Sequence, residues 1–388
     1  VVDRAEGIRI WDTDGNVYID ACSGAVITNI GYGHASITDA IQKQAQKTYF
    51  AYRLHFESQP ILDYSKALVE QSAEHLDRVF FVSGGSEAVE SAIKLCRQYF
   101  YDSNQGSRHI FISRVPSYHG CTVGTLALTA YAPLEAPFRP LLKAYPKIPA
   151  PYCYRCVFNL AYPDCDLKCA RELEKTILEQ GPENVAGFIT EPVGGASTGG
   201  IVPPDGYFEV IQKTCQKFGV MLILDEVMTG FGRTGKLFAY EHWNIEADIV
   251  ALSKGMASGY FPLGAILARH SIVDTALDSG GFKHGHTYAG NPMACAVGLE
   301  VLDFIQRHDL CLNARRRGRQ LKKGLETMAR RMPIIGQVRG KGLLIGVELV
   351  RNPDTKEPFP VDGNAAQRLT DNAFKDGLII YPLSLIHI

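Results

Sequence analysis

The sequence predicts an α/β fold: a large domain with a mostly parallel mixed β-sheet flanked by helices, and a smaller α+β domain. Two observations predict it: short apolar runs recur between about residues 50 and 282, and stretches of helical periodicity separate them. Apolar runs of this kind are typical of strands buried on both faces, and their alternation with helices is typical of βαβ units. A chain of 388 residues is long enough to bury a large core.

Six apolar runs are the strand candidates of this sheet. They are Val79–Val82, His109–Ser113, Val185–Thr190, Val220–Asp225, Ile249–Ser253 and Leu263–Ala268. Helical patterns lie between them, as in Glu87–Tyr101 and Tyr207–Phe218. We expect these segments to form the large central domain, residues 46–285.

The two ends of the chain are predicted to build the smaller domain together, from residues 1–45 and 286–388. Short strand-like pieces at Ile8–Trp11 and Val17–Asp20 begin the chain. A helical stretch follows Asn291, and a strand is expected at Gly342–Val350. Residues 383–388 stop after what looks like the start of another strand, so we expect a truncated chain.

The composition excludes several classes of function. Lys and Arg number 40 against 41 Asp and Glu, so no positive surface for nucleic acid or an anionic membrane is predicted. No apolar run reaches the roughly 18 residues of a membrane-spanning helix. Ten cysteines in a chain of this length favour a reducing compartment, and we expect a cytoplasmic protein.

Two polar residues stand at the ends of neighbouring strand candidates. Asp225 ends the run from Val220, and Lys254 follows the run that begins at Ile249. In open α/β sheets, ligands bind just beyond the carboxyl ends of the strands. A pyridoxal phosphate enzyme needs this pair: the lysine forms an imine with the cofactor, and the aspartate keeps the ring nitrogen protonated.

A glycine turn between a strand and a helix is the candidate phosphate site. Gly84, Gly85 and Ser86 follow Val82 and precede a helical pattern. Free N–H groups at a helix start favour phosphate, and Ser86 is expected to cap the helix and to donate its hydroxyl to the phosphate. Taken alone, the turn equally fits an ordinary capped helix start; beside Lys254 and Asp225, the phosphate interpretation is favoured.

Further residues at strand ends are candidate cofactor contacts. Tyr118 is expected to stack on the ring, with His119 as its orienting neighbour, and Val227 to pack on the opposite face of the ring. Glu191 follows a strand and is expected near the ring hydroxyl or a basic gate. Thr287 is interpreted as a hydroxyl donor near a phosphate.

Two other patterns are assigned structural roles. Glu226 and Arg233 are expected to be structural partners, with each other as one option. Four cysteines give C-x2-C-x8-C-x3-C, which leaves zinc, a disulfide or free packing thiols open, with packing favoured. They are Cys153, Cys156, Cys165 and Cys169. No metal site is predicted.

With these motifs assembled, the chain resembles the class III (omega) pyridoxal-phosphate-dependent aminotransferases of fold type I over nearly its whole length. The most specific matches are Ile223–Gly235 and Ser253–Gly255. Further matches are Ser23–Val26, Gly31–His34, Gly85–Ala88, Tyr118–Gly120, Glu191–Pro192 and His286–Tyr288. The resemblance implies Lys254 as the imine lysine, Asp225 on the ring nitrogen, Gly85 and Ser86 on the phosphate, and Tyr118 stacked on the ring.

The resemblance also implies partners and substrates. Thr287 would reach the phosphate of a neighbouring subunit, which implies a homodimer with shared sites. Ala25, Val26, Tyr52 and Arg53 are candidate substrate contacts at the entrance. The implied reaction moves an amino group from an amine or amino acid, possibly an omega-amine, to a keto acid such as pyruvate or 2-oxoglutarate, with ping-pong kinetics.

Three alternatives stay open at this point. An aminomutase or a decarboxylase would keep the same cofactor residues and differ in its substrate pocket. A truncated chain would dimerise without turnover. A zinc-stabilised binding module built on the cysteine loop would explain none of the residues at the strand ends.

Overall fold

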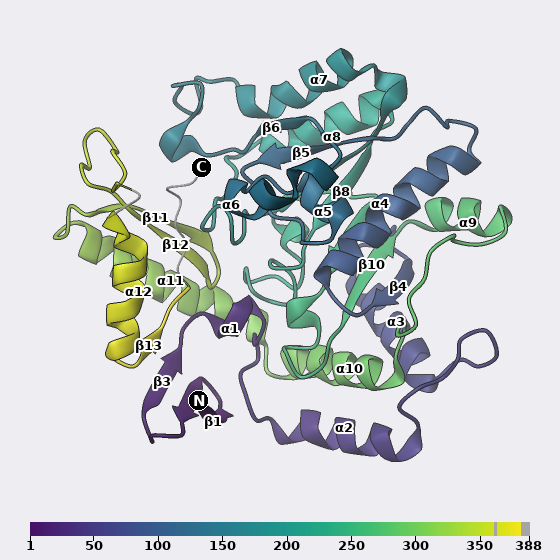
Figure 1. Ribbon diagram of the computed structural model, residues 1–388, viewed down its shortest axis with the longest axis horizontal. Coiled ribbons are helices and arrows are strands. Elements are labelled where there is room, and N and C mark those ends of the chain that lie inside the picture. The colour runs from purple at the N-terminus through teal and green to yellow at the C-terminus, as the bar shows by residue number, and fades with distance from the viewer. Residues whose placement is uncertain (361–362, 382–388) are drawn as a thin grey trace.

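The structure is a computed structural model that describes residues 1–360 and 363–381. Its main layer is a seven-stranded sheet with the order β4-β10-β9-β8-β7-β5-β6 (Figure 1). The strands are β4 (Arg78–Val82), β5 (Ile110–Val115), β6 (Lys147–Pro149), β7 (Val185–Thr190), β8 (Met221–Asp225), β9 (Ile249–Leu252) and β10 (Gly264–Ala268). β10 runs antiparallel to β4 and β9, and the other neighbouring pairs are parallel. The predicted mostly parallel mixed sheet is confirmed.

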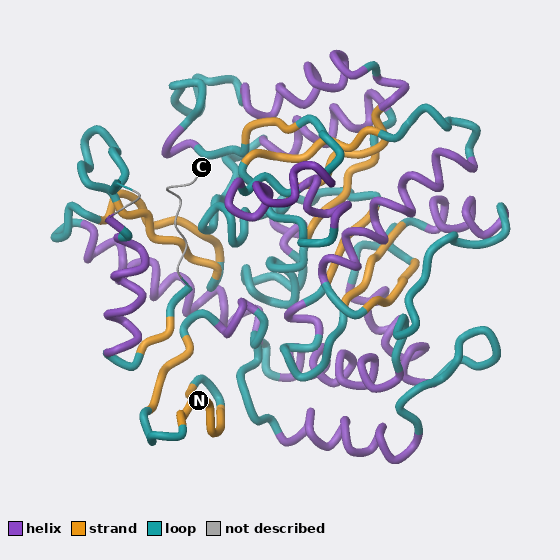
Figure 2. The backbone as a smooth tube through the Cα atoms, viewed as in Figure 1, coloured by secondary structure: helices purple, strands orange, loops and turns teal. Residues whose placement is uncertain are grey.

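Helices cover both faces of this sheet (Figures 1 and 2). Successive side chains of a strand point to opposite faces. On β8, Met221 and Ile223 pack into the apolar cluster of α4 (Gly85–Asp102) and α9 (His270–Asp278). Leu222 and Leu224 pack into the cluster of α7 (Lys168–Gln180) and α8 (Tyr207–Phe218). Because β8 is buried on both faces, its sequence is continuously apolar up to Asp225.

The remaining helices surround this core. α10 (Pro292–Arg307) packs against α2 (Ala35–Lys47) and α3 (Gln59–Gln71). The shorter helices are α1 (Ser23–Val26), α5 (Val123–Leu128), α6 (Ala132–Glu135), η1 (Ala136–Leu141), η2 (Cys153–Arg155), η3 (Pro182–Asn184), η4 (Ala239–His242) and η5 (Lys254–Met256).

Local sequence determines where several helices begin and end. Asn291 caps α10, because its side chain accepts hydrogen bonds from the N–H groups of Met293 and Ala294. Pro292 then occupies the first helical position, where its missing N–H costs nothing. α8 ends at Gly219, whose φ of 61° lies in the left-handed region that favours glycine.

The two ends of the chain share a second sheet, beside the main one. Its strands are β1 (Val2–Glu6), β2 (Arg9–Asp12), β3 (Val17–Asp20) and β13 (Leu378–Ile379), and β13 pairs in parallel with β3. A hairpin of β11 (Ile335–Lys341) and β12 (Leu344–Leu349) packs on α11 (Leu310–Ala329), and α12 (Ala365–Lys375) packs on β13. The domain boundaries 1–45, 46–285 and 286–388 stay a prediction, and the expected strand start at 383–388 lies outside the described residues.

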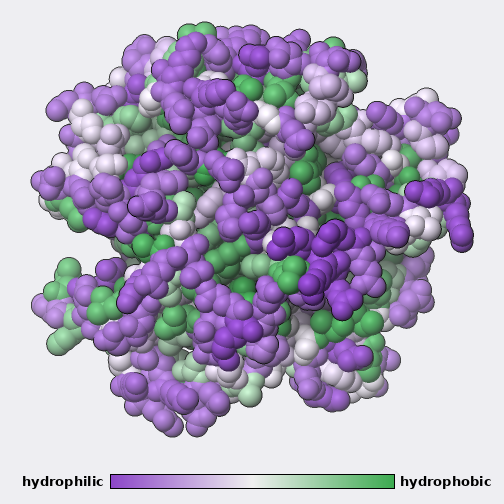
Figure 3. All heavy atoms as spheres, turned by 180° about the vertical axis from the view of Figure 1, so that it is seen from behind, coloured by the Kyte–Doolittle hydropathy of each residue, from purple (hydrophilic) through white to green (hydrophobic). Residues whose placement is uncertain are grey.

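One face of the molecule is mainly polar. Seen from behind, hydrophilic side chains cover most of the molecule, and hydrophobic atoms gather in the recesses between them (Figure 3). Among residues 1–360 and 363–381, no helix has the length and apolar character needed to cross a membrane.

Candidate active site

A cleft opens where five strands of the main sheet end. It is lined by segments that follow the carboxyl ends of β4, β5, β7, β8 and β9. Its lining residues are Gly85, Ser86, Tyr118, His119, Gly120, Glu191, Val193, Ala196, Asp225, Val227, Met228, Thr229 and Lys254. The sheet therefore brings together eight of the predicted cofactor residues, every one except Thr287, from segments far apart in the sequence.

Lys254 and Asp225 lie at the floor of this cleft. β8 and β9 are adjacent parallel strands. Asp225 ends β8 and Lys254 follows β9, so both side chains reach the same cleft. Burial lowers the pKa of Lys254, while the carboxylates of Asp225 and Glu191 raise it and Arg233 lowers it further. Its amine is therefore uncharged at lower pH than that of an ordinary lysine.

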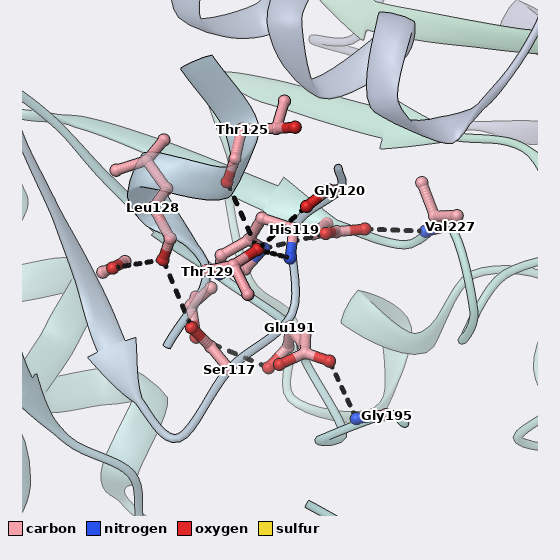
Figure 4. Close-up of polar contacts among 12 residues, drawn as sticks. Ser117, His119, Gly120, Thr125, Leu128, Thr129, Glu191, Gly195 and Val227 are labelled. Carbon is pink, nitrogen blue, oxygen red and sulfur yellow. Dashed lines mark hydrogen bonds and ion pairs between the residues drawn. The ribbon is translucent and has the colours of Figure 1, made fainter. Parts of the chain in front are cut away.

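Asp225 is held in place by two hydrogen bonds. His119 Nδ1 donates to Asp225 Oδ2 over 2.8 Å, and the Val227 N–H donates to Oδ1 over 3.1 Å (Figure 4). The backbone N–H of His119 donates in turn to Thr129 Oγ1. His119 was expected to orient Tyr118, and the hydrogen bond to Asp225 is a contact that the sequence did not predict. The carboxylate is thus buried and fixed, with its charge directed at the cleft.

Gly85 and Ser86, after β4, form a cradle together with Gly120, after β5. A Cβ atom added at Gly85 would lie 2.8 Å from Val227 Cγ1, closer than packed atoms approach. A Cβ atom at Gly120, where φ is +133°, would lie 2.7 Å from Ser86 Oγ. Both glycines keep backbone and hydroxyl groups accessible beside the start of α4, as phosphate binding at a helix N-terminus requires.

The expected capping role of Ser86 is wrong. The N-cap of α4 is Gly84, and no side chain makes a cap hydrogen bond there. Ser86 already lies inside the first helical turn, where its Oγ accepts the Cys121 N–H over 3.1 Å. The Ser83 N–H is instead satisfied by Glu87 Oε2 at 2.8 Å. The hydroxyl of Ser86 therefore faces the cleft side of the turn.

Tyr118 and Glu191 differ in how deeply they are buried in the cleft. Tyr118 is half-buried, and burial raises the pKa of its phenol. Glu191 is 4% exposed, and its Oε1 accepts the Gly195 N–H over 2.8 Å. One charged neighbour of Glu191 is Arg114, whose Nη2 lies 3.9 Å from Glu191 Oε2. This buried arginine comes from β5, inside the sheet.

Five predicted residues lie outside the cleft. Thr287 is exposed and is absent from the lining of this chain's own cleft. The same holds for the candidate substrate contacts, Ala25, Val26, Tyr52 and Arg53. Their predicted roles stay predictions.

Four lining residues were missed. Met228 and Thr229 continue the segment after Asp225, and Val193 and Ala196 follow Glu191. Their closeness in sequence to predicted site residues was the available signal. Val193, Ala196 and Met228 were missed because apolar side chains give no chemical signal, and the hydroxyl of Thr229 is used in a hydrogen bond to Glu226.

Glu226 and Arg233 are not paired with each other. The Glu226 carboxylate accepts hydrogen bonds from Thr229 Oγ1 and from two backbone N–H groups, those of Ala239 and Tyr240. Arg233 donates to Ser23 Oγ over 3.1 Å. Asp225 lines the cleft and Glu226 does not, because consecutive side chains at a strand end point to opposite sides.

Four cysteines between β6 and the first turn of α7 line a second, small cavity. Cys153, Cys156, Cys165 and Cys169 all contribute to its wall. Every one of them is a free thiol, and burial raises the pKa of Cys153 and Cys169. In the part of the chain that the structure describes, no group of three or more His, Cys, Asp and Glu side chains is arranged to hold a metal ion.

Comparison with known proteins assigns the family. The class-III aminotransferase family model matches residues 1–386. The chain belongs to the class III aminotransferases. It is 40% identical over 383 residues to the uncharacterized aminotransferase YodT of Bacillus subtilis, which covers 98% of this chain and 86% of that protein. It is 34% identical to the putrescine–pyruvate aminotransferase of Pseudomonas aeruginosa, with 98% and 83% covered.

A solved structure supports the same assignment for the fold. The PLP-bound amine transaminase of an uncultivated Pseudomonas species is 35% identical and superimposes with a TM-score of 0.95. The match covers 99% of this aminotransferase and 88% of that chain. The predicted fold type I architecture is thus confirmed. Class III aminotransferases depend on pyridoxal 5′-phosphate, and transamination between amine donors and keto acids is the reaction of this family.

Proposed function

We propose that this aminotransferase takes the amino group of a terminal (omega) amine or of an amino acid and passes it to pyruvate or 2-oxoglutarate, using Lys254 and Asp225. One observation carries the proposal: both side chains follow neighbouring parallel strands and line one cleft. The putrescine–pyruvate aminotransferase among its relatives supports a donor with a terminal amine and pyruvate as an acceptor.

The residues of the cleft have different roles in this proposal. When bound, pyridoxal phosphate supplies an aldehyde that takes up the amino group and a ring that accepts the electrons of the bond being broken. Asp225 holds a proton on the ring nitrogen, and His119 keeps that carboxylate oriented. Ser86, Gly85 and the first turn of α4 bind the phosphate.

Lys254 acts as the proton carrier in this proposal. Its Nζ would take the proton from the amine-bearing carbon of the donor and hold it for return, while the bound cofactor would supply the ring that stabilises the charge left on that carbon. Burial lowers the pKa of Lys254 below its ordinary value of 10.5, so its free amine forms at lower pH than that of an exposed lysine. Tyr118 and Val227, which both line the cleft, would hold the ring from its two faces.

The two half-reactions provide the test. Each candidate donor, a diamine such as putrescine or an α-amino acid such as alanine, is added alone to the protein loaded with cofactor. We expect the visible absorption band to disappear with a true donor, and pyruvate or 2-oxoglutarate to restore it. Release of carbon dioxide would identify a decarboxylase, and an isomerised amino acid an aminomutase. A band that no donor removes would show a protein that binds the cofactor without turnover.

We also propose that the chain forms a homodimer with shared clefts. Apolar side chains are exposed along residues 49–56: Tyr49 is 73%, Leu54 77% and Phe56 68% exposed. Phe50 packs edge-on against Tyr288, next to Thr287. Exposed apolar patches of this kind are typical of interfaces. In a dimer, Thr287 would reach the cleft of the second copy, and Ala25, Val26, Tyr52 and Arg53 would line the entrance that substrates use.

Sedimentation of Phe56→Asp tests the dimer. A buried aspartate would disrupt an interface, so we expect monomers that bind the cofactor weakly. An unchanged mass would contradict the proposed interface.

A cytoplasmic location is proposed from the ten free cysteines, and cell fractionation tests it.

A further inference from the structure

A buried arginine lies directly behind the cleft. Arg114 is in β5 and is 2% exposed, in a strand whose other members are mainly apolar. Its Nη2 donates to the backbone carbonyl of Glu191 over 2.7 Å and lies 3.9 Å from the carboxylate Oε2 of the same residue. Charged groups are seldom buried to this degree without a partner, because moving a charge out of water is costly.

Four charged or titratable side chains lie between the sheet and the cleft. They are Arg114, Glu191, His119 and Asp225. Figure 4 shows Glu191 and His119 on neighbouring segments, with His119 hydrogen-bonded to Asp225. Glu191 Oε2 and His119 Nε2 are both buried, and neither has a hydrogen-bond partner among the described residues. Glu191, His119 and Asp225 thus line the cleft, and Arg114 lies beside Glu191 without lining it.

We propose that Arg114 is a positioning residue that keeps Glu191 ionised, and that the ionised Glu191 supports the positive charge that Lys254 carries at the cleft. This proposal rests on the proposed role of Lys254. Glu191, unlike Arg114, lines the cleft together with Lys254. The negative end of the pair is therefore nearer to Lys254 than its positive end.

The balance of charges gives the direction of the effect. Burial raises the pKa of Glu191, as does Asp225, whereas His119, Arg114 and the Gly195 N–H lower it. Without Arg114, the Glu191 carboxyl binds a proton more readily. The charge facing Lys254 then falls, and the pKa of its nitrogen falls with it, because Asp225 and Glu191 both raise that pKa while Arg233 lowers it. Arg114 also acts on the phenol of Tyr207 on α8: burial raises the pKa of this phenol to about 12, and Arg114 lowers it.

The first test needs no cofactor. Infrared difference spectra of the apoprotein at neutral pH detect protonated buried carboxyl groups. We expect a protonated-carboxyl band in Arg114→Met that is absent from the wild type, from Arg114→Lys, which keeps the charge, and from Arg114→Met/Glu191→Gln. The buried Glu226 carboxyl, whose pKa burial raises to about 7, contributes equally to all four spectra. A folded Arg114→Met without that band would overturn the proposal.

The second test uses the protein loaded with cofactor. The absorption band of cofactor bound to Lys254 is titrated with pH, and the midpoint in Arg114→Met is expected to fall by about one pH unit. The double variant should match the Arg114→Met shift, because Arg114 acts through Glu191. Lower thermal stability with an unchanged midpoint would show a purely structural arginine and overturn the proposal.

The double variant and the wild type distinguish a failure to fold from a failure of the proposed function. If Arg114→Met does not fold, the double variant decides: removing both charges should restore folding, since an apolar replacement of a buried pair is often neutral. A double variant that stays unfolded would contradict the pairing. A wild type that never links cofactor to Lys254 would instead refute the proposed function, whatever the infrared result.

Discussion

Replacing Gly120 with alanine tests the cradle beside α4. Gly120 has a φ of +133°, which side chains of L residues rarely adopt. Holding alanine there costs about 1–3 kcal/mol. Its Cβ atom would also lie 2.5 Å from Thr125 Oγ1 and 2.7 Å from Ser86 Oγ. Relieving such contacts costs roughly another 1–3 kcal/mol, so the free energy of unfolding should fall by about 2–6 kcal/mol.

The same substitution should weaken cofactor binding. The new methyl group pushes Ser86 Oγ from the position where it accepts the Cys121 N–H at 3.1 Å. A hydrogen bond to a charged phosphate is worth about 1.5–3 kcal/mol. Its loss corresponds to roughly a 10- to 150-fold rise in Kd for pyridoxal phosphate.

Two assays and one matched control measure this. Denaturant unfolding of the apoprotein gives the stability change, and titration of the apoprotein with cofactor gives Kd. Gly106→Ala is the control, because a Cβ atom there meets nothing within 4 Å and no positive φ applies. It should change stability by less than about 0.5 kcal/mol. If Gly120→Ala behaved like this control in both assays, the cradle would not be a cofactor contact.

Three further predictions address neighbouring parts of the structure. Asp225→Asn removes the carboxylate that accepts the hydrogen bond from His119 Nδ1 over 2.8 Å. The kcat should fall by about 100- to 1,000-fold with the protein still folded, which half-reaction kinetics will check. Asn291→Ala removes the cap of α10, and denaturant unfolding should show a loss of about 1 kcal/mol. The third concerns pH: because burial lowers the pKa of Lys254 from its ordinary 10.5, the rate at which apoprotein takes up cofactor should rise with pH and reach its half-maximum below pH 10.5. A midpoint at or above 10.5, a fully stable Asn291→Ala, or an unimpaired Asp225→Asn would each contradict the corresponding contact.

The sequence predicted the main sheet closely, because buried strands leave a simple signal. All six predicted strands are present within two residues at either end. β6 was missed, since Lys147–Pro149 is only three residues long and ends in proline. The antiparallel direction of β10 was also beyond reach, because an apolar run carries no information on the direction of its neighbours.

The site was predicted unevenly, for physical reasons. Lys254 and Asp225 were recognised because a charge at the end of an apolar run is conspicuous. Arg114 carries a similar signal, a charge within the apolar strand Ile110–Val115, and was overlooked. The hydrogen bond from His119 to Asp225 joins residues 106 positions apart, which no local pattern reveals.

Chemical trapping tests the central claim most directly. Borohydride reduction of the protein loaded with cofactor fixes pyridoxal phosphate to the amine that holds it, and peptide mass spectrometry then locates the label. We predict the label on Lys254 and its loss in Lys254→Ala. A label on another lysine, such as the half-buried Lys147, would contradict the assignment of the cleft.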